Sequence, residues 1–265
     1  MENLKNQRFS DDIVLFASNS KYLKSILTDL KTESLKVGLK INIEKTKILT
    51  NQSTNTNTLL INGNQYEIVE NFKYLGQLIT RDGNKDSEIQ QRISHGWRQY
   101  GRLNKIFKNE DLPLNLKKKA FDQCVLPTLT YGSETWNTTK TQETKIQIAQ
   151  RGMERSMLGI KRIDKIRNND IRQRTKLIDS LQVAKRNKWR WAGHIARQQD
   201  NRWTKLTTEW QPLNYSRRQG RPRERWRNDL HNFFGNDWST WAGDRRMWRA
   251  MGEVFVQQWT TNDCN

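Results

Sequence analysis

The stretch that decides the fold is residues 9–17, which read FSDDIVLFA. Two adjacent carboxylates, Asp11 and Asp12, stand directly before an apolar run rich in β-formers, and this pattern predicts a buried strand behind an acidic turn. Adjacent carboxylates repel each other, and a shared divalent cation removes that repulsion. The stretch therefore predicts a metal-binding turn, with a plain structural turn as the alternative.

Downstream of this stretch, helix and strand signals alternate up to about residue 83. A helix is predicted over 20–37, with Asn19 or Ser20 as its N-terminal cap and Gly38 as its left-handed end. Strands are predicted at 39–43, 59–61, 65–69 and 72–79, with Asn62-Gly63-Asn64 as a hairpin turn.

Beyond residue 84 the strand signals almost vanish. One long amphipathic helix is predicted through Ile89, Ile93, Trp97, Tyr100 and Phe107. A second is predicted to begin at Pro113 and to close at Pro127, and a third carries Ile146, Ala149, Met153 and Met157. The predicted fold class is α+β and predominantly α, with a small antiparallel sheet followed by helices. Predicted boundaries near 83 and 160 divide the chain into 1–83, 84–160 and 161–265.

The charge of the chain favours a polyanionic partner. Lys and Arg number 47 against 28 Asp and Glu, a net charge of +19. Residues 151–230 hold 22 basic and 8 acidic side chains, so most of the excess lies there. Such an excess attracts nucleic acid, and a solvated helical face is the alternative. No apolar run approaches the ~20 residues that span a bilayer. The absence of a signal sequence and the two cysteines suit the nucleus or cytoplasm.

The last hundred residues combine tryptophan with arginine. Nine of the 11 Trp lie between Trp189 and Trp259. Basic side chains neutralise phosphates, and exposed indoles stack on unpaired bases. We expect Trp189 to be the stacking residue and Trp191 to lie in the core. The candidate phosphate-binding residues are Lys185, Arg186, Lys188 and Arg190 on a helix, and Arg217, Arg218, Arg221 and Arg223 in a basic loop.

Residues 9–17 resemble the Phe/Tyr-x-Asp-Asp hairpin of reverse transcriptases. The stretches 38–42 and 45–47 are similar to the next motif of the polymerase palm, and 72–76 resembles the primer-grip strand. They occur in the family's order with family-like gaps. The segments 129–136, 189–197 and 220–226 are similar to the tails of LINE-type, non-LTR retrotransposon reverse transcriptases.

This resemblance implies roles for particular residues. Asp11 would be a Mg²⁺ ligand with Asp12 as its partner in the hairpin. Lys45 matches a basic position for which a proton donor to pyrophosphate has been proposed, and a solvated strand-end lysine is the alternative. The primer grip would comprise Phe72, Tyr74, Leu75 and Gly76, which can also pack in the core. Residues 1–83 would be a partial palm, 84–160 a thumb and 161–265 a nucleic-acid-binding region. Thumb lysines Lys105, Lys108 and Lys117 to Lys119 would follow the duplex backbone, and a solvated turn of helix is the alternative for Lys117 to Lys119.

The family's other catalytic aspartate lies well upstream of the Asp-Asp motif, and only eight residues precede Phe9. A two-metal site that lacks one carboxylate binds its ions poorly. We therefore expect a C-terminal portion of an RNA-directed DNA polymerase that binds an RNA template and RNA–DNA or DNA duplex without polymerising alone. The alternatives are a non-enzymatic nucleic-acid-binding protein derived from a retroelement, and the product of a decayed reading frame, which the intact periodicities disfavour.

Overall fold

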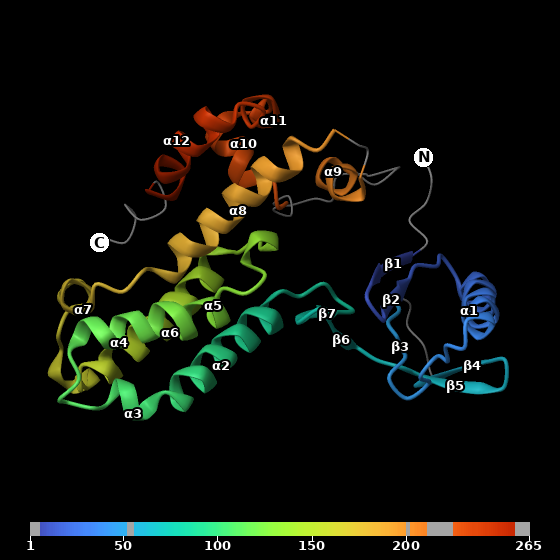
Figure 1. Cartoon of the computed structure of the whole chain (residues 1–265), viewed down its shortest axis with the longest axis horizontal. Helices are drawn as coiled ribbons and strands as arrows, with labels where there is room; N and C mark the ends of the chain where they lie inside the picture. Colours follow the sequence, from blue (N-terminus) through green and yellow to red (C-terminus); the bar gives the residue numbers. More distant parts are fainter. Residues whose placement is uncertain (1–5, 52–55, 200–201, 211–224, 258–265) are drawn as a thin grey trace. The chain divides into compact units, whose positions relative to one another are not determined.

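The computed structural model describes residues 6–51, 56–199, 202–210 and 225–257 (Figure 1). Its residues form two compact units, Met1–Asn84 and Lys85–Asn265, and each is considered by itself. The predicted α+β, predominantly helical class is confirmed, since strands occur only in the first unit among the described residues. The three-part division at 83 and 160 remains a prediction.

The first unit opens with a hairpin and a helix. Strands β1 (Asn6–Phe9) and β2 (Asp12–Leu15) pair antiparallel. Helix α1 (Ser20–Lys36) begins where the Asn19 side chain accepts from the backbone N–H of Tyr22. It ends at Lys36, and Gly38 just beyond the cap residue Val37 closes the last turn with a φ of 77° and a hydrogen bond to the carbonyl oxygen of Leu35. The predicted helix and both of its ends are confirmed.

A second hairpin supplies most of this unit's buried apolar side chains. Strands β4 (Thr58–Ile61) and β5 (Asn64–Ile68) pair antiparallel, and β3 (Lys47–Ile48) adds parallel to β5. The turn residues Asn62 and Gly63 both have positive φ, as a two-residue hairpin turn requires, so this prediction is confirmed. The core of the unit is Leu27, Ile61 and Tyr66.

Two strand predictions were wrong. Residues 39–43 form no strand. The side chain of Asn42 accepts a hydrogen bond from the N–H of Lys45, and the backbone carbonyl oxygen of Asn42 accepts one from the N–H of Thr46, so the chain turns here. Residues 72–79 form a hairpin of β6 (Asn71–Tyr74) and β7 (Gln77–Thr80) rather than one strand. Leu75 and Gly76 supply the positive φ values, 47° and 82°, of its turn.

The second unit begins with a series of helices whose ends differ from those predicted. Helix α2 (Asp86–Arg102) stops at Leu103, and Phe107 belongs to the short α3 (Asn104–Phe107). Helix α4 (Leu114–Ala120) continues through a wide π turn (Phe121–Val125) into α5 (Leu126–Leu129). Pro127 therefore does not close the helix. Proline lacks an N–H, and its ring crowds the preceding turn of an α-helix, whereas the π turn here widens that turn.

Helix α6 (Lys140–Met157) is the central helix of this unit. Thr139 and Gln142 form a capping box at its start. Its predicted apolar stripe is confirmed, with Ile146, Ala149, Met153 and Met157 all buried. These side chains join two apolar clusters that include residues of α2, of the π turn and of the segment around Leu177 and Ala184.

The remaining elements precede or follow α8 (Ser180–Ala196) in the chain. They are α7 (Asn168–Thr175), α9 (Trp203–Glu209), α10 (Asn228–Phe234), α11 (Trp238–Trp241) and α12 (Arg245–Gln257), with short 3-10 turns at Ser133–Thr135 and Arg162–Asp164. A cluster rich in aromatic side chains joins α8, α10, α11 and α12. Figure 1 shows the places of these four helices in the second unit. Among the described helices, none has both the length and the apolarity that crossing a bilayer demands.

Candidate nucleic-acid interface

The acidic pair lies at the tip of the first hairpin. Phe9 pairs with Asp12 across the strands, so Ser10 and Asp11 make the two-residue turn. Ser10 has a φ of 54°, in the left-handed region that the first central residue of such turns adopts. Asp11 and Asp12 are both exposed, so their carboxylates are open to a cation or to a substrate.

The carboxylates of the described residues do not assemble a complete metal site. Within the described ranges, no group of three or more His, Cys, Asp or Glu side chains lies close enough to hold an ion. Mg²⁺ usually takes protein carboxylates together with substrate phosphates and water. Asp11 and Asp12 therefore fit one side of such a site and not a two-metal centre, and no catalytic step follows from them alone.

The other predicted palm residues lie in turns of the same unit. Lys45 is exposed in the turn that Asn42 stabilises. Phe72 and Tyr74 are half-buried on β6, while Leu75 and Gly76 form the turn that follows. The hairpin gives the primer-grip stretch a defined shape, and its role and that of Lys45 remain predictions.

The predicted cationic face of α8 is only partly exposed. Lys185 and Lys188 are buried, and the Nζ atoms lie 3.3 Å and 2.8 Å from a carboxylate oxygen of Asp229. Lys185 also lies 3.0 Å from Glu143. Although burial opposes it, the two ammonium groups hold the pKa of the Asp229 carboxyl below its ordinary value. Both lysines form ion pairs inside the protein. Their burial corrects the prediction that they bind phosphates.

The two tryptophans of α8 lie opposite to the prediction: the one expected to stack on a base is buried, and the one expected in the core is partly exposed. Trp189 is 3% exposed and stacks on Trp248 with ring centroids 3.7 Å apart. Its Nε1 donates to the carbonyl oxygen of Trp248, so it cannot serve as a base-stacking platform without unfolding this core. Trp191 is partly exposed and stacks on His194 at 5.3 Å. Trp191 is therefore the better-placed indole for a base.

The remaining predicted cations divide by exposure. Arg190 is exposed, and Arg186 makes two 2.9 Å hydrogen bonds to Glu253. Arg217, Arg218, Arg221 and Arg223 lie outside the described residues. Of the thumb lysines, Lys105, Lys108 and Lys119 are exposed, Lys118 is half-buried and Lys117 is buried.

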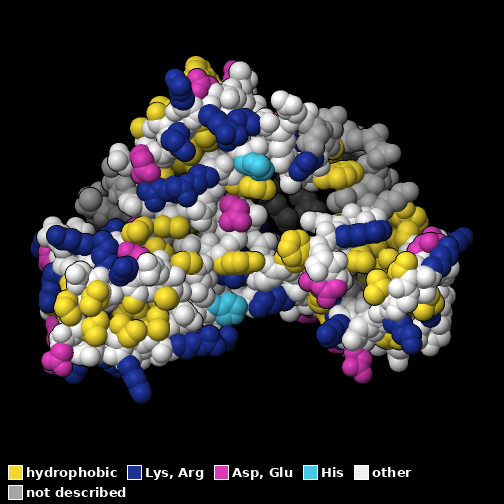
Figure 2. Space-filling model, in the orientation of Figure 1, with side chains coloured by type: hydrophobic (Ala, Val, Ile, Leu, Met, Phe, Trp, Pro, Cys, Tyr) yellow, Lys and Arg dark blue, Asp and Glu magenta, His cyan; other side chains and the backbone are white. Residues whose placement is uncertain are grey.

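The segment 161–176 is a basic surface that the sequence pattern did not single out. It contains seven Lys or Arg and two Asp, and all its cations except Arg172 are exposed. They are Lys161, Arg162, Lys165, Arg167, Arg174 and Lys176. The excess of basic residues in 161–176 can be counted in the sequence, but a count over the wider window 151–230 does not single it out. Lys and Arg side chains are also spread over much of the face drawn in Figure 2.

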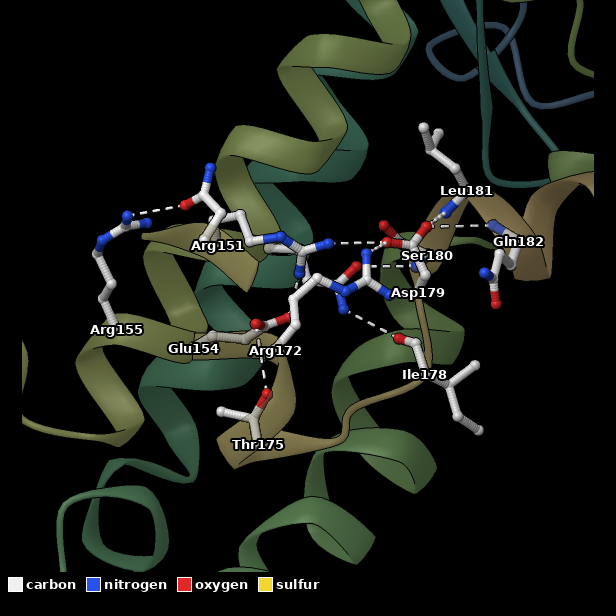
Figure 3. Close-up of polar contacts among 12 residues, drawn as sticks. Arg151, Glu154, Arg155, Arg172, Thr175, Ile178, Asp179, Ser180, Leu181 and Gln182 are labelled. Carbon is white, nitrogen blue, oxygen red and sulfur yellow. Dashed lines mark hydrogen bonds and ion pairs between the residues drawn. The ribbon is translucent and has the colours of Figure 1, made fainter. Parts of the chain in front are cut away.

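A buried ion network holds the far end of this basic segment against α6 and α8 (Figure 3). Arg151 of α6 pairs with Glu154 and with Asp179, to which its Nη2 lies 2.8 Å away. Arg172 of α7 reaches the same Asp179 carboxylate at 2.5 Å. Burial raises the pKa of Glu154 despite these arginines. The network fixes α7 to the interior, so that its exposed cations stand on an ordered support.

A second set of contacts in Figure 3 fixes the start of α8. Gln150 accepts from the N–H of Ser180 at 2.8 Å and donates to the carbonyl oxygen of Ile178 at 2.9 Å. Asp179 caps α8 by accepting from the N–H groups of Leu181 and Gln182. The chain between α7 and α8 is therefore bound along its length by side chains of α6 and by its own cap.

Comparison with known proteins places these observations in a family. The family described as reverse transcriptase (RNA-dependent DNA polymerase) matches residues 2–79, which include the acidic hairpin and the predicted primer grip. A transposon-derived protein of Caenorhabditis elegans is 34% identical over 278 aligned positions, which cover 98% of this chain and 98% of that protein. No solved structure matches.

The acidic hairpin and the first unit thus define a reverse-transcriptase-like protein. More particularly, the chain belongs to the family of that transposon-derived relative, whose likeness extends through the helical second unit.

Proposed function

We propose that the chain is a LINE-type retroelement protein that binds RNA and RNA–DNA or DNA duplex through cations of its second unit. The observation that carries this proposal is the basic segment 161–176, whose exposed cations stand on a buried ion network. Reverse transcriptases act on nucleic acid, and affinity for phosphates grows with each cation that replaces a counterion. The nucleus or cytoplasm, where such templates occur, is its expected location.

A salt titration tests the binding. The full chain is mixed with a fluorescent RNA–DNA hybrid, and the dissociation constant is measured by anisotropy at several salt concentrations. We expect the logarithm of affinity to fall linearly with the logarithm of salt, with a slope of about −0.9 for each phosphate neutralised on a duplex. Binding that does not weaken as salt rises contradicts the proposal.

Two charge-matched variants locate the interface. Lys161, Arg162 and Arg167 are changed together to Gln, and Lys21, Lys24 and Lys31 of α1 are changed together as the control. Both variants lose the same charge, so a non-specific effect of net charge lowers their affinities equally. The proposal requires a flatter salt slope for the 161–167 variant than for the α1 variant, and equal slopes exclude this segment.

Polymerisation is a second candidate function, which the acidic hairpin favours. We propose that Asp11 and Asp12 act only when the remaining palm and fingers residues are supplied, because the described residues hold no third carboxylate near them. Primer extension on an RNA template with Mg²⁺ is expected to give no product with the chain alone. Product that disappears with Asp11→Ala would show that the chain is a complete polymerase.

A further inference from the structure

The turn that precedes α7 exposes one isoleucine among cations. Ile163 is 80% exposed, the largest value among the exposed large apolar side chains of the described residues. Its neighbours in the chain, Lys161, Arg162, Lys165 and Arg167, are exposed as well. A large aliphatic side chain in this position gains nothing from folding, because it stays in water. Its placement is therefore unexplained by the packing of the unit.

The turn is ordered and holds Ile163 in place. The N–H of Lys161 donates to the Asp164 carboxylate at 2.7 Å, and the N–H of Asp164 donates back to the carbonyl oxygen of Lys161 at 3.2 Å. Lys165 then adopts a left-handed backbone with a φ of 50°, which ends the 3-10 turn. The side chain of Ile163 is thus presented at the tip of a closed turn.

The base of the turn is fixed to α6. Arg155 donates from Nη2 to the carbonyl oxygen of Ile166 at 3.3 Å and to the Asn168 side chain at 2.8 Å. Figure 3 labels Arg155 and marks a contact of its guanidinium with a dashed line. A preformed turn loses little conformational entropy when it binds, which favours a direct contact with a ligand.

We propose that Ile163 is a wedge that inserts between base pairs in the minor groove of a nucleic-acid duplex while the surrounding cations bind the phosphates. This inference rests on the proposed nucleic-acid binding and adds the contact that deforms the duplex. Aliphatic side chains flanked by Lys or Arg enter the minor groove in this way, unstack a base step and bend the duplex. The bend brings more phosphates within reach of the protein.

A duplex fits this turn better than a lipid surface does. Peripheral membrane binding relies on a broad apolar helix face together with basic residues. Here a single aliphatic side chain stands among four cations, which provides charge without a comparable apolar area. The four closely spaced cations instead match the regularly spaced phosphates on either side of a groove.

The test uses the full chain and a short RNA–DNA hybrid, with a DNA duplex of equal length beside it. Each duplex carries a fluorophore at either end, so that energy transfer reports bending while anisotropy reports affinity. Ile163→Ala is compared with Ile163→Leu, which keeps an aliphatic side chain. Ile148→Ala is the matched control, because Ile148 is also exposed, at 66%, but lies on α6.

We expect Ile163→Ala to lower duplex affinity about tenfold, because alanine is too short to bury the same apolar surface between base pairs. The change in energy transfer should disappear with it. Its salt slope should be no steeper than that of the wild type, because the cations are all retained while the unbent duplex brings fewer phosphates within their reach. Ile163→Leu should retain both signals, and Ile148→Ala should change neither.

Three outcomes overturn the wedge. In the first, Ile163→Ala leaves affinity and bending unchanged, and in the second, Ile148→Ala has the same effect as Ile163→Ala. In the third, Ile163→Ala weakens binding to phosphatidylserine vesicles and not to either duplex, which indicates a membrane contact instead. If the wild-type chain itself fails to bind either duplex, the proposed function fails. If the wild type binds and Ile163→Ala behaves like it, only the wedge fails.

Discussion

At the scale of single residues, the pairing of α8 with α12 depends on two reciprocal Trp-x-x-x-Gly pairs. The indoles of Trp189 and Trp248 lie nearly parallel, 5° apart, and each Nε1 donates to the other residue's carbonyl oxygen. Each ring also lies against the glycine four residues beyond the other tryptophan. A Cβ at Gly193 would lie 2.4 Å from Nε1 of Trp248, and one at Gly252 would lie 3.0 Å from Nε1 of Trp189.

Gly193→Ala should therefore destabilise the second unit. The added methyl must displace a stacked, hydrogen-bonded indole, and such overpacking costs about 1–3 kcal/mol. Gly101→Ala in α2 is the matched control, because nothing lies within 4 Å of its added Cβ. Alanine there should stabilise the helix by about 0.5–1 kcal/mol. Urea unfolding followed by tryptophan fluorescence measures both changes. Equal midpoints for the two variants would show that the indole pair can move aside.

Asp229 gives a second residue-scale prediction, which concerns acid stability. Its folded pKa lies below the ordinary 3.8, so its stabilising contribution is complete above that value and is lost as the pH falls through the lower folded pKa. At neutral pH, Asp229→Ala should cost about 3–5 kcal/mol, because Lys185 and Lys188 lose a buried partner.

The measurement is the free energy of unfolding of the wild type and Asp229→Ala as a function of pH. The difference between them should shrink as the pH falls below 3.8. Asp237→Ala removes an exposed aspartate beside α11 and should give a small difference throughout. A difference for Asp229→Ala that persists unchanged into strong acid would mean that its charge is not what stabilises the fold.

These residues also show which features of the second unit could be predicted from the sequence and which could not. The basic and Trp-rich character of the second unit was evident, but the places of Trp189 and Trp191 were exchanged. Lys185 and Lys188 were assigned to solvent because lysines are seldom buried, and only the fold reveals that Asp229, 41 residues beyond Lys188, approaches them. A long-range partner leaves no local pattern. The charge excess of 161–176, in contrast, could have been found in a shorter window.

At the scale of elements, Asp179 combines a helix cap with an ion network. Its Oδ1 accepts from two N–H groups of α8, while its Oδ2 binds Arg151 and Arg172. Asp244 provides a comparison, since its Oδ1 likewise accepts from Arg246 and Met247 at the start of α12 but from an exposed position.

Asp179→Ala should therefore cost more than Asp244→Ala. Loss of a cap costs about 1 kcal/mol, and removing the buried carboxylate that Arg151 and Arg172 share, which leaves Arg151 with Glu154 alone, raises the total to about 3–5 kcal/mol. Thermal and urea unfolding of both variants measures the difference. Costs that agree within error would assign Asp179 to capping alone and remove the ion network as the support of α7.

A helix, strand or turn could be predicted where the residues of that segment alone indicate its backbone conformation. Asn62-Gly63 announces a two-residue hairpin turn, and that turn is present. Leu75-Gly76 forms the same kind of turn with a bulky residue at positive φ, so the pattern indicated one long strand instead. Pro127 is a helix breaker by rule, yet the preceding π turn lets the helix continue. Both errors arise where the backbone adopts a conformation that the residue at that position does not usually favour.

At the scale of the whole molecule, buried apolar side chains are divided unequally between the units. Of 28 such side chains in the described residues, the first unit holds only Leu27, Ile61 and Tyr66. Several of its apolar side chains instead lie on the surface, among them Phe9 and Val37, which are 62% and 72% exposed. The stability of a segment follows the burial of its contacts, so the first unit should open more readily than the second.

Hydrogen exchange in the intact chain tests this inequality on two comparable helices. Helix α1 has 17 residues and α6 has 18, and each begins at a side-chain cap. Differences in helix length and capping are therefore small, and burial is the main contrast, since α1 buries Leu27 alone whereas α6 buries nine side chains. We expect the amides of α1 to exchange faster than those of α6 by more than tenfold, which corresponds to an opening free energy lower by at least about 1.4 kcal/mol. Equal protection would mean that the first unit draws its stability from contacts other than its own buried apolar side chains.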